Sequence, residues 1–512
     1  MLKIRNLLIV MTTSFLSLGA LAAPLNDFLK TPEASQQLDS IVRFPETLNN
    51  VTLLHLGVNS LAVREKLISE AMNYIFVSVP FWVHDDSGTG LLQEILHKNV
   101  DFKVIEDWSS PYLSNGGQQI KYELGSHVMF WNSPSWKRRF SYKVTGNHLH
   151  DKFLIVDGEK MIIGGMNMAD EYLQGGKTEK GWHDTDVLIE GPAVQQGSNI
   201  FLKLWQFGNY MSNQNNAFPP WEKQEITALN SFFYNNVEDH DFQAMNPESG
   251  DPIERVPAKI NYTVHIPILD LLKDPRYFPN LPAATAGQVP VRLIYDNPLF
   301  DRTPEDKHVS KVFGTLAYLF KHAQKSAAFY FPYFTPDKEF SAALIDAAKR
   351  LDITIITNSY DSWDMAKSGY VDQLSHYPDL LKAGIKIYEW QGHAQLKLLE
   401  KKGFKIGFWP GNTMHSKIAL FDGSVALVGS DNMNSQSLDR NNEVMAMVND
   451  ENFAAQIANI FNSDINGVAS VGNGSASETL PLVQLIDETK RAAMADKYKA
   501  SPDPVWSYPL GL

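Results

Sequence analysis

Cysteine is absent from the 512-residue chain. This absence excludes disulfide bonds, thiolate metal sites, cysteine nucleophiles and a lipid-modified N-terminal cysteine. Basic residues are also in the minority, because 45 Lys and Arg stand against 58 Asp and Glu, which gives a formal net charge of −13. A nucleic-acid-binding surface is usually basic, so the composition argues against a general nucleic-acid binder.

Long hydrophobic runs are scarce as well. A membrane-spanning helix needs about 20 predominantly apolar residues, and the longest run, residues 7–21, is interrupted by hydroxyl side chains. Lys3 and Arg5 precede this run, and it ends in Ala20-Leu21-Ala22, an order typical of a secretory signal peptide rather than a membrane anchor. We therefore expect residues 1–22 to be a cleaved signal peptide and the mature protein to be secreted or periplasmic.

One pattern occurs twice in the chain. HDKFLIVDGEKMIIGGMN (residues 150–167) and HSKIALFDGSVALVGSDN (residues 415–432) share His, Lys, Asp, Gly and Asn at the same spacing. Upstream of each copy, at residues 63–106 and 316–358, apolar periodicities predict helix, strand, helix and strand in the same order. Alternating helices and strands predict an α/β fold in which each half is a mainly β sheet flanked by helices.

The repeat sets the expected boundaries. We predict two homologous halves at residues 24–232 and 291–465, which pack together around one shared active site. Residues 233–290, which are rich in Asn, Asp and Pro, are expected to form a linker or insertion. Residues 466–512 are expected to form a tail that packs on the second half and contains a helix at 482–498.

The first copy predicts a β-hairpin, because two apolar runs flank Asp157-Gly158, a strong hairpin signal. A two-residue turn there places the small residue Gly165 opposite His150. Side chains alternate along a strand, so His150 and Lys152 point the same way, and Asn167 lies at the same end. We interpret Asp157 as a turn residue of the motif rather than a catalytic group.

The second copy predicts the same geometry. Its turn is Asp422-Gly423, which places Ser430 opposite His415, with Lys417 and Asn432 at the same end. We interpret Asp422, like its counterpart, as a structural turn residue. Two copies that face each other would surround one cavity with two imidazoles, two ammonium groups and two carboxamides.

These groups suit a phosphodiester. Lysines and carboxamides can hold the non-bridging oxygens and stabilise charge as phosphorus becomes five-coordinate. One histidine would attack phosphorus to form a phosphohistidine, while the other would protonate the departing oxygen. The lysines supply the positive charge, so we expect no metal and no other cofactor. Each imidazole also needs a carboxylate on its far nitrogen, and the candidates are Asp184, Asp186 and Glu443.

The two copies of H-x-K-x(4)-D followed by G-[SG]-x-N resemble the phospholipase D superfamily. GGMNMADEYL, WHDTDVLIEGPAV and GSDNMNSQSLDRNNEV are similar to its bacterial cardiolipin synthase and secreted phospholipase D branch. The resemblance covers roughly residues 53–461 and implies one active site at the interface of the halves. It implies that His150 is the nucleophile, His415 the general acid, and Asp184 and Glu443 the carboxylates that orient them.

We therefore expect a phosphodiesterase or transphosphatidylase that acts on glycerophospholipids by hydrolysis or headgroup exchange. The alternative is a nuclease of the same superfamily, which the acidic composition disfavours and two basic, aromatic loops favour. Each loop directly precedes a histidine motif and is expected to line the rim of the cavity. Since Trp with Lys or Arg suits lipid headgroups, we expect peripheral contact with a membrane surface. The rim residues are Trp131, Trp136, Arg138, Lys402 and Trp409. The sequence indicates no partner protein.

A zinc site is the other alternative. His148 and His150 are two residues apart and could bind zinc with His183 or Asp184. The position that corresponds to His148 in the second copy is Thr413, so such a site would not be duplicated, which favours chemistry without a metal. His183 is then expected to lie in an exposed loop.

Overall fold

The computed structural model describes most of both halves. The described ranges are 23–98, 100–108, 124–132, 147–175, 181–213, 285–299, 301, 308–392, 401, 411–471, 477–480 and 482–498. The predicted signal peptide, most of the predicted linker and the rim residues Trp136, Arg138, Lys402 and Trp409 lie outside them. These expectations stay predictions.

The first half contains the predicted alternation of helix and strand. α3 (Gly57–Glu70) leads into β2 (Tyr74–Val79), and α4 (Asp86–His97) leads into β3 (Asp101–Asp107). α4 begins where the Asp85 carboxylate accepts the Gly88 amide, which satisfies one free N–H of the first turn. The other elements of this half are β1 (Thr47–His55), η3 (Gly125–His127), β4 (Val128–Trp131), β5 (His148–Leu149), β6 (Phe153–Val156), β7 (Lys160–Gly164), α9 (Asp170–Leu173), β8 (Thr185–Glu190) and α10 (Pro192–Asn213).

The second half repeats the order. α13 (Lys311–His322) leads into β10 (Ser326–Tyr330), and α14 (Lys338–Ala347) leads into β11 (Asp352–Asn358). Ser310 and Asp337 cap the two helices as Asp85 caps α4. The other elements are β9 (Thr285–Asp296), α15 (Lys367–Lys382), β12 (Lys386–Trp390), β13 (Ile418–Phe421), β14 (Val425–Gly429), α17 (Ser435–Asp439), β15 (Asn441–Val448) and α18 (Glu451–Asn466).

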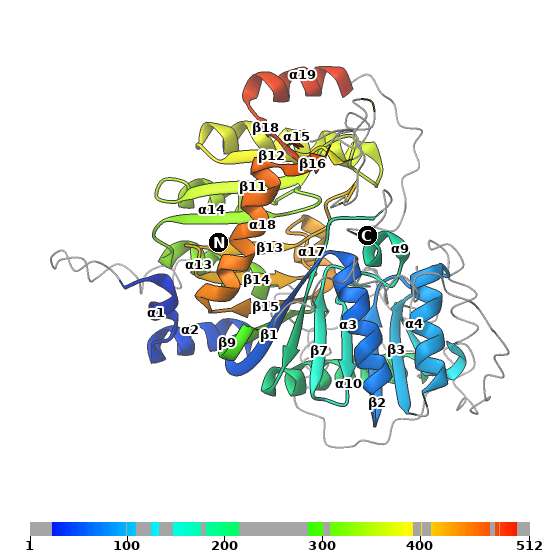
Figure 1. The fold of residues 1–512 in the computed structure, drawn as a ribbon. Coiled ribbons are helices and arrows are strands. Elements are labelled where there is room, and N and C mark those ends of the chain that lie inside the picture. The colour runs from blue at the N-terminus through cyan, green and yellow to red at the C-terminus, as the bar shows by residue number, and fades with distance from the viewer. Residues whose placement is uncertain are drawn as a thin grey trace.

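The two halves share one continuous sheet (Figure 1). With β18 (Val483–Ile486) at one edge, its order is β18-β12-β11-β10-β13-β14-β15-β9-β1-β8-β7-β6-β2-β3-β4. The halves therefore join where β9 pairs antiparallel with β1. Outward from this junction, the strands of the second half (β15, β14, β13, β10, β11, β12) follow the same order as their counterparts in the first half (β8, β7, β6, β2, β3, β4). The predicted α/β fold of two pseudo-symmetric halves is confirmed, and the edge-to-edge join is an addition that the sequence did not indicate.

The core is shared between the halves. Residues of α10 and α18, including Phe201, Trp205, Phe453 and Ile457, belong to one buried cluster with strands of both halves. The other sheet faces are covered separately, by α3 and α4 in the first half and by α13, α14 and α15 in the second. Among the described helices, none combines the length and hydrophobicity required to cross a bilayer.

Both ends of the described chain pack on the second half. α1 (Leu25–Leu29) and α2 (Pro32–Val42), which the predicted boundaries assign to the first half, share a core with α13. At the other end, β18 (Val483–Ile486) pairs with β12 and precedes α19 (Glu488–Tyr498). The tail thus packs where expected, but part of the predicted helix at 482–498 is a strand, because Val483 and Ile486 are buried against the sheet.

Candidate active site

Each histidine motif forms a β-hairpin, but the predicted register is wrong by one residue. Phe153 pairs with Ile163, where a two-residue turn would pair it with Ile162, because three residues, 157–159, connect β6 and β7. The second hairpin is shifted in the same way, since Ile418 pairs with Val428. Gly165 and Ser430 are therefore not opposite the histidines.

The motif aspartates lie at the hairpin turns. Asp157 has a φ of 55° and Asp422 a φ of 52°, values that Asp tolerates better than most residues. The Asp157 carboxylate accepts the backbone amides of residues 72, 73 and 74 at 2.7–2.9 Å. Asp422 accepts those of residues 324, 325 and 326 at 2.8–3.0 Å. Each aspartate thus fixes the hairpin to the start of a neighbouring strand, β2 or β10.

The segments that precede the hairpins cross into the opposite half. The amide of His150 donates to the carbonyl of Asn442 at 3.2 Å, beside Glu443. The amide of His415 donates to the carbonyl of His183 at 2.7 Å, beside Asp184. These backbone hydrogen bonds therefore place each histidine beside the acidic residue of the other half.

The side chains complete this exchange. Nδ1 of His150 lies 2.9 Å from both carboxylate oxygens of Glu443, and Nδ1 of His415 lies 2.8 Å from Oδ2 of Asp184. A carboxylate at Nδ1 fixes the tautomer and leaves Nε2 to react. Of the two candidates in the first half, Asp186 is occupied elsewhere, because Arg64 donates to it at 2.9 Å.

The motif lysines lie beside the histidines. Nζ of Lys152 donates to the carbonyl of His150 at 2.7 Å, and Nζ of Lys417 donates to that of His415 at 2.5 Å. Burial lowers the pKa of Lys152 to about 8 and that of Lys417 to about 7, although the nearby carboxylates act in the opposite direction. A bound phosphodiester anion would raise both pKa values, because an opposite charge favours the ammonium form.

The two imidazoles are buried, with 8% of His150 and 4% of His415 exposed. Burial, and then the lysine ammonium groups, hold both pKa values well below the usual 6.5. His150 is also among the causes of the lowered pKa of His415. A neutral imidazole is the form that can attack phosphorus.

The carboxamides and small residues differ in their surroundings. Oδ1 of Asn167 and Oδ1 of Asn432 are buried without a hydrogen-bond partner among the described residues, and such atoms are rare unless a ligand or water completes them. Ser430 donates to Glu443 at 2.5 Å. At the equivalent position, a Cβ on Gly165 would lie 2.2 Å from Oδ1 of Asp184, so only glycine fits there.

Two expectations about neighbouring residues are wrong. Trp131 does not line a rim, because it is fully buried in β4 and its indole N–H donates to Asn147 at 2.9 Å. His183 does not lie in an exposed loop, because it is fully buried and its Nε2 lies 3.0 Å from Asp464. Trp131 belongs to the buried cluster shared by the two halves. The ring of His183 packs against those of Tyr330 and Trp390.

The alternative zinc site does not form in the described part of the chain. His148 pairs with Asp107 at 3.2 Å, whereas His150 and Asp184 are each engaged with a residue of the other half. The four candidate ligands therefore point to separate partners.

Several site residues were missed in the sequence. The rings of Tyr172 and Trp182 lie 5.0 and 5.3 Å from that of His415, centroid to centroid. Asp151, between His150 and Lys152 in sequence, accepts from Ser78 and from the hydroxyl of Tyr295. These contacts join distant segments, so neither spacing nor periodicity could have revealed them.

Comparison with known proteins places this geometry in a family. The family model described as "Cardiolipin synthase, PLD-like domain" matches residues 65–205 and 316–465, one match in each half. The chain belongs to this family. The two matches contain the two histidine motifs and both orienting carboxylates, so the predicted resemblance to the phospholipase D superfamily is confirmed.

Relatives within this PLD-like family are distant. The chain is 24% identical over 404 residues to cardiolipin synthase 1 of Bacillus cereus, which covers 78% of this chain and 63% of that protein. It is 25% identical over 406 residues to cardiolipin synthase 1 of Staphylococcus aureus, covering 78% and 64%. The chain thus spans less than two thirds of the length of these relatives. Phosphatidylserine synthase of Haemophilus influenzae has the same fold, with a TM-score of 0.52, 13% identity and coverage of 92% and 95%.

Proposed function

We propose that the protein is a phosphatidyl-transferring phosphodiesterase that acts on glycerophospholipids. The observation that carries this proposal is the pair of imidazoles, each held at Nδ1 by a carboxylate of the other half, with a lysine beside each. The matching family model is described as a cardiolipin synthase domain, and this supports a lipid rather than a nucleic-acid substrate. The acidic composition points the same way.

The reaction would proceed in two steps. Nε2 of His150 attacks phosphorus, the bond from phosphorus to the headgroup oxygen breaks, and His415 gives its proton to that oxygen. A second alcohol, or water, then attacks the phosphohistidine, passes its proton to His415 and releases His150. Lys152, Lys417 and the two carboxamides would hold the non-bridging oxygens. Binding of the anionic substrate favours the proton on His415, which burial otherwise disfavours.

A product profile tests the proposal. Purified protein is incubated with vesicles of phosphatidylglycerol and phosphatidylethanolamine, with and without added glycerol, and the lipids are resolved by mass. We expect a new phosphatidyl ester whose amount depends on the alcohol, with phosphatidate where water competes. Conversion of plasmid DNA but of no phospholipid by the same preparation would contradict the lipid assignment, and His150→Ala should abolish either activity.

The order of the two histidines is tested by trapping. With a nitrophenyl phosphodiester, His415→Ala should accumulate a phosphohistidine that an alkaline quench preserves, because the good leaving group needs little protonation. His150→Ala should form none. The mirrored result would exchange the two roles.

We also infer export and peripheral membrane contact. The layout of residues 1–22 supports cleavage after Ala22, and a phospholipid substrate requires access to a lipid surface. N-terminal sequencing of protein recovered from the periplasm or medium tests the cleavage. Flotation with vesicles tests membrane contact, and an uncleaved N-terminus on the cytoplasmic side would contradict export.

A further inference from the structure

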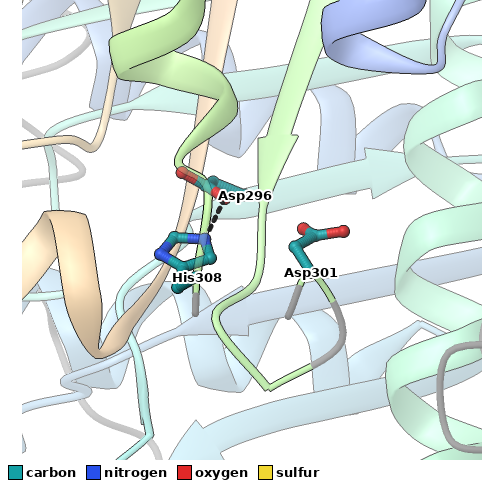
Figure 2. A group of neighbouring side chains, drawn as sticks. All are labelled: Asp296, Asp301 and His308. Atoms are coloured by element: carbon teal, nitrogen blue, oxygen red, sulfur yellow. Dashed lines mark hydrogen bonds and ion pairs between the residues drawn. The ribbon is translucent and has the colours of Figure 1, made fainter. Parts of the chain in front are cut away.

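A second buried charge cluster lies behind Glu443, at the end of β9. Asp296 is the last residue of β9 and pairs with Glu443 across the sheet. Asp301 and His308 lie beside it, as Figure 2 shows, and their potential ligand atoms lie within 4.8 Å of one another. This spacing would suit a metal ion, but the atoms already have other partners.

His308 has no ring nitrogen left for a metal. Its Nε2 lies 2.8 Å from Oδ1 of Asp296, and its Nδ1 lies 2.5 Å from the carbonyl oxygen of Leu438. Both partners are acceptors, so both ring nitrogens donate and the side chain is an imidazolium. Nζ of Lys311 lies 2.5 Å from Asp301, so two cations balance two carboxylates in this cluster.

The bond to Leu438 connects this cluster to the active site. Leu438 is the penultimate residue of α17, and β15 begins at Asn441. Glu443 is the third residue of β15 and holds Nδ1 of His150. The hydrogen bond from the His308 imidazolium therefore holds the segment that connects α17 to β15.

The corresponding support in the first half is different. Behind Asp184, the buried carboxylate of Asp186 is paired with Arg64 at 2.9 Å. An arginine keeps its charge at every pH at which proteins are folded, whereas a histidine does not. The cluster behind Glu443 therefore contains a histidine that can titrate near neutral pH, whereas the Asp186–Arg64 pair contains no such group.

We propose that His308 is a positioning residue, whose doubly bonded imidazolium holds the α17–β15 connection so that Glu443 keeps His150 oriented. For its effect on rate, this inference rests on the proposed function. Loss of one proton leaves two acceptors facing a ring with a single donor, so one of the two bonds must break.

The charged groups around His308 decide when that loss occurs. They are Asp296 from β9, Asp301 from the loop after it, Lys311 from α13 and Asp431 from the loop after β14. Burial alone would lower the pKa of His308, but Asp296 and Asp301 raise it above the usual 6.5. Because the folded-state pKa is raised, the positioning effect is complete below pH 6.5 and is lost as the pH rises through the folded-state pKa.

Nuclear magnetic resonance of histidine-labelled protein tests the charge state without any activity. The signals of His308 are assigned by their absence in His308→Gln. We expect His308 to titrate above pH 6.5 in the native protein and at lower pH in Asp296→Asn. The Nδ1–H proton of His150 is hydrogen-bonded to Glu443. In each of the two proteins, its signal should weaken over the pH interval in which His308 titrates in that protein. A neutral His308 at pH 6 would overturn the proposal. A His150 signal that stays unchanged while His308 titrates would overturn it as well.

Kinetics with a nitrophenyl phosphodiester test the consequence. His308→Gln should lower kcat by about 10- to 100-fold, the scale on which small misplacement of a reacting group acts, with KM little changed. It should also remove the alkaline limb of the pH profile, and Asp296→Asn should move that limb to lower pH. His322→Gln, at the far end of α13, is the matched control and should keep the native profile.

Three results would separate the possible failures. A native pH profile and native kcat in His308→Gln would overturn the positioning role. Saturable binding of Zn²⁺ or Mn²⁺ that His308→Gln abolishes would overturn the charge assignment in favour of a metal site. Inactivity of the native protein on every phosphodiester would defeat the proposed function, while the resonance titration would still decide the role of His308.

Discussion

Each motif histidine is held by a carboxylate that belongs to the other half. His150 lies against Glu443, and His415 lies against Asp184. The longer Glu side chain has Ser430 beside it, whereas the shorter Asp has Gly165. The two copies of the site are therefore equivalent in position but not in detail, and that difference can bias which histidine attacks.

The crossed pairing predicts distinct effects of two conservative substitutions. Glu443→Gln should impair the nucleophile and Asp184→Asn the acid, so both should lower the rate on phospholipids by about 10² to 10⁴. With a nitrophenyl phosphodiester, only Asp184→Asn should recover much of the first step. The nitrophenolate released in the burst before the steady state measures this first step, and equal recovery in both variants would contradict the assignment.

At the scale of elements, the motif aspartates act on the backbone. Each carboxylate gathers three amide groups that precede a strand, so it joins the tip of a hairpin to the start of that strand. These turns lie at the opposite ends of the hairpin strands from the histidines. The geometry that the two turns share thus supports the sheet, and the turns do not reach the substrate.

Removal of either turn carboxylate should reduce stability rather than chemistry. Asp422→Ala and Asp157→Ala should each lower the free energy of unfolding by about 1.5–3 kcal/mol, the range for hydrogen bonds to a charged group. Urea denaturation measures the loss, and kcat per folded molecule at 25 °C should stay close to native. A large fall in kcat without a loss of stability would show a catalytic role.

A buried glutamate in β12 makes the second half sensitive to pH. Glu389 is 1% exposed and accepts from the hydroxyls of Tyr370 and Tyr377 at 3.0 and 3.1 Å. Burial raises the pKa of Glu389 to about 8, although the two hydroxyls act against this. Its contribution to stability is complete below the usual pKa of 4.5 and is lost as the pH rises through 8.

Glu389→Gln should remove this pH dependence. Relative to the variant, the native protein should lose up to about 1.4 kcal/mol of unfolding free energy per pH unit between pH 4.5 and 8. Urea denaturation of both proteins at pH 5, 6, 7 and 8 measures the difference. A difference that stays constant over this interval would show that Glu389 is ionised in the folded protein throughout.

On the scale of the whole molecule, the junction of β1 and β9 makes the two halves one body. One buried cluster contains residues of both halves, from α10 in the first to α18 in the second. α1 and α2 further connect the beginning of the chain to the second half, where the buried Arg292 pairs with Asp39. The site therefore exists only in the assembled molecule, because neither half contains both a histidine and its carboxylate partner.

This arrangement predicts that the halves unfold together. Heat or urea should remove circular dichroism, tryptophan fluorescence and phosphodiesterase activity in coincident transitions, although chains of this size often unfold in stages. The shared core and the continuous sheet are the physical reason. A first transition that abolishes activity while half of the circular dichroism persists would show that the halves fold independently.

The sequence by itself determined the duplicated unit and most of its local structure. Apolar periodicity identified α3, α4, α13 and α14 with the strands that follow them, because helix and strand spacing depends on near neighbours. The motif spacing likewise singled out His150, Lys152, His415 and Lys417 as the candidate reactive groups. A chain without cysteine also had to hold these groups without disulfide bonds.

Tertiary structure decided which residues meet. His150 and Glu443 are 293 residues apart, and their contact arises because the strand before His150 pairs with β15 of the other half. The burial of His183 beside Met414 and the bond from His308 to Leu438 likewise depend on residues far away in the sequence. Local patterns report the periodicity of a segment, whereas partners across a sheet depend on how the two halves join, and that join is formed by β1 and β9.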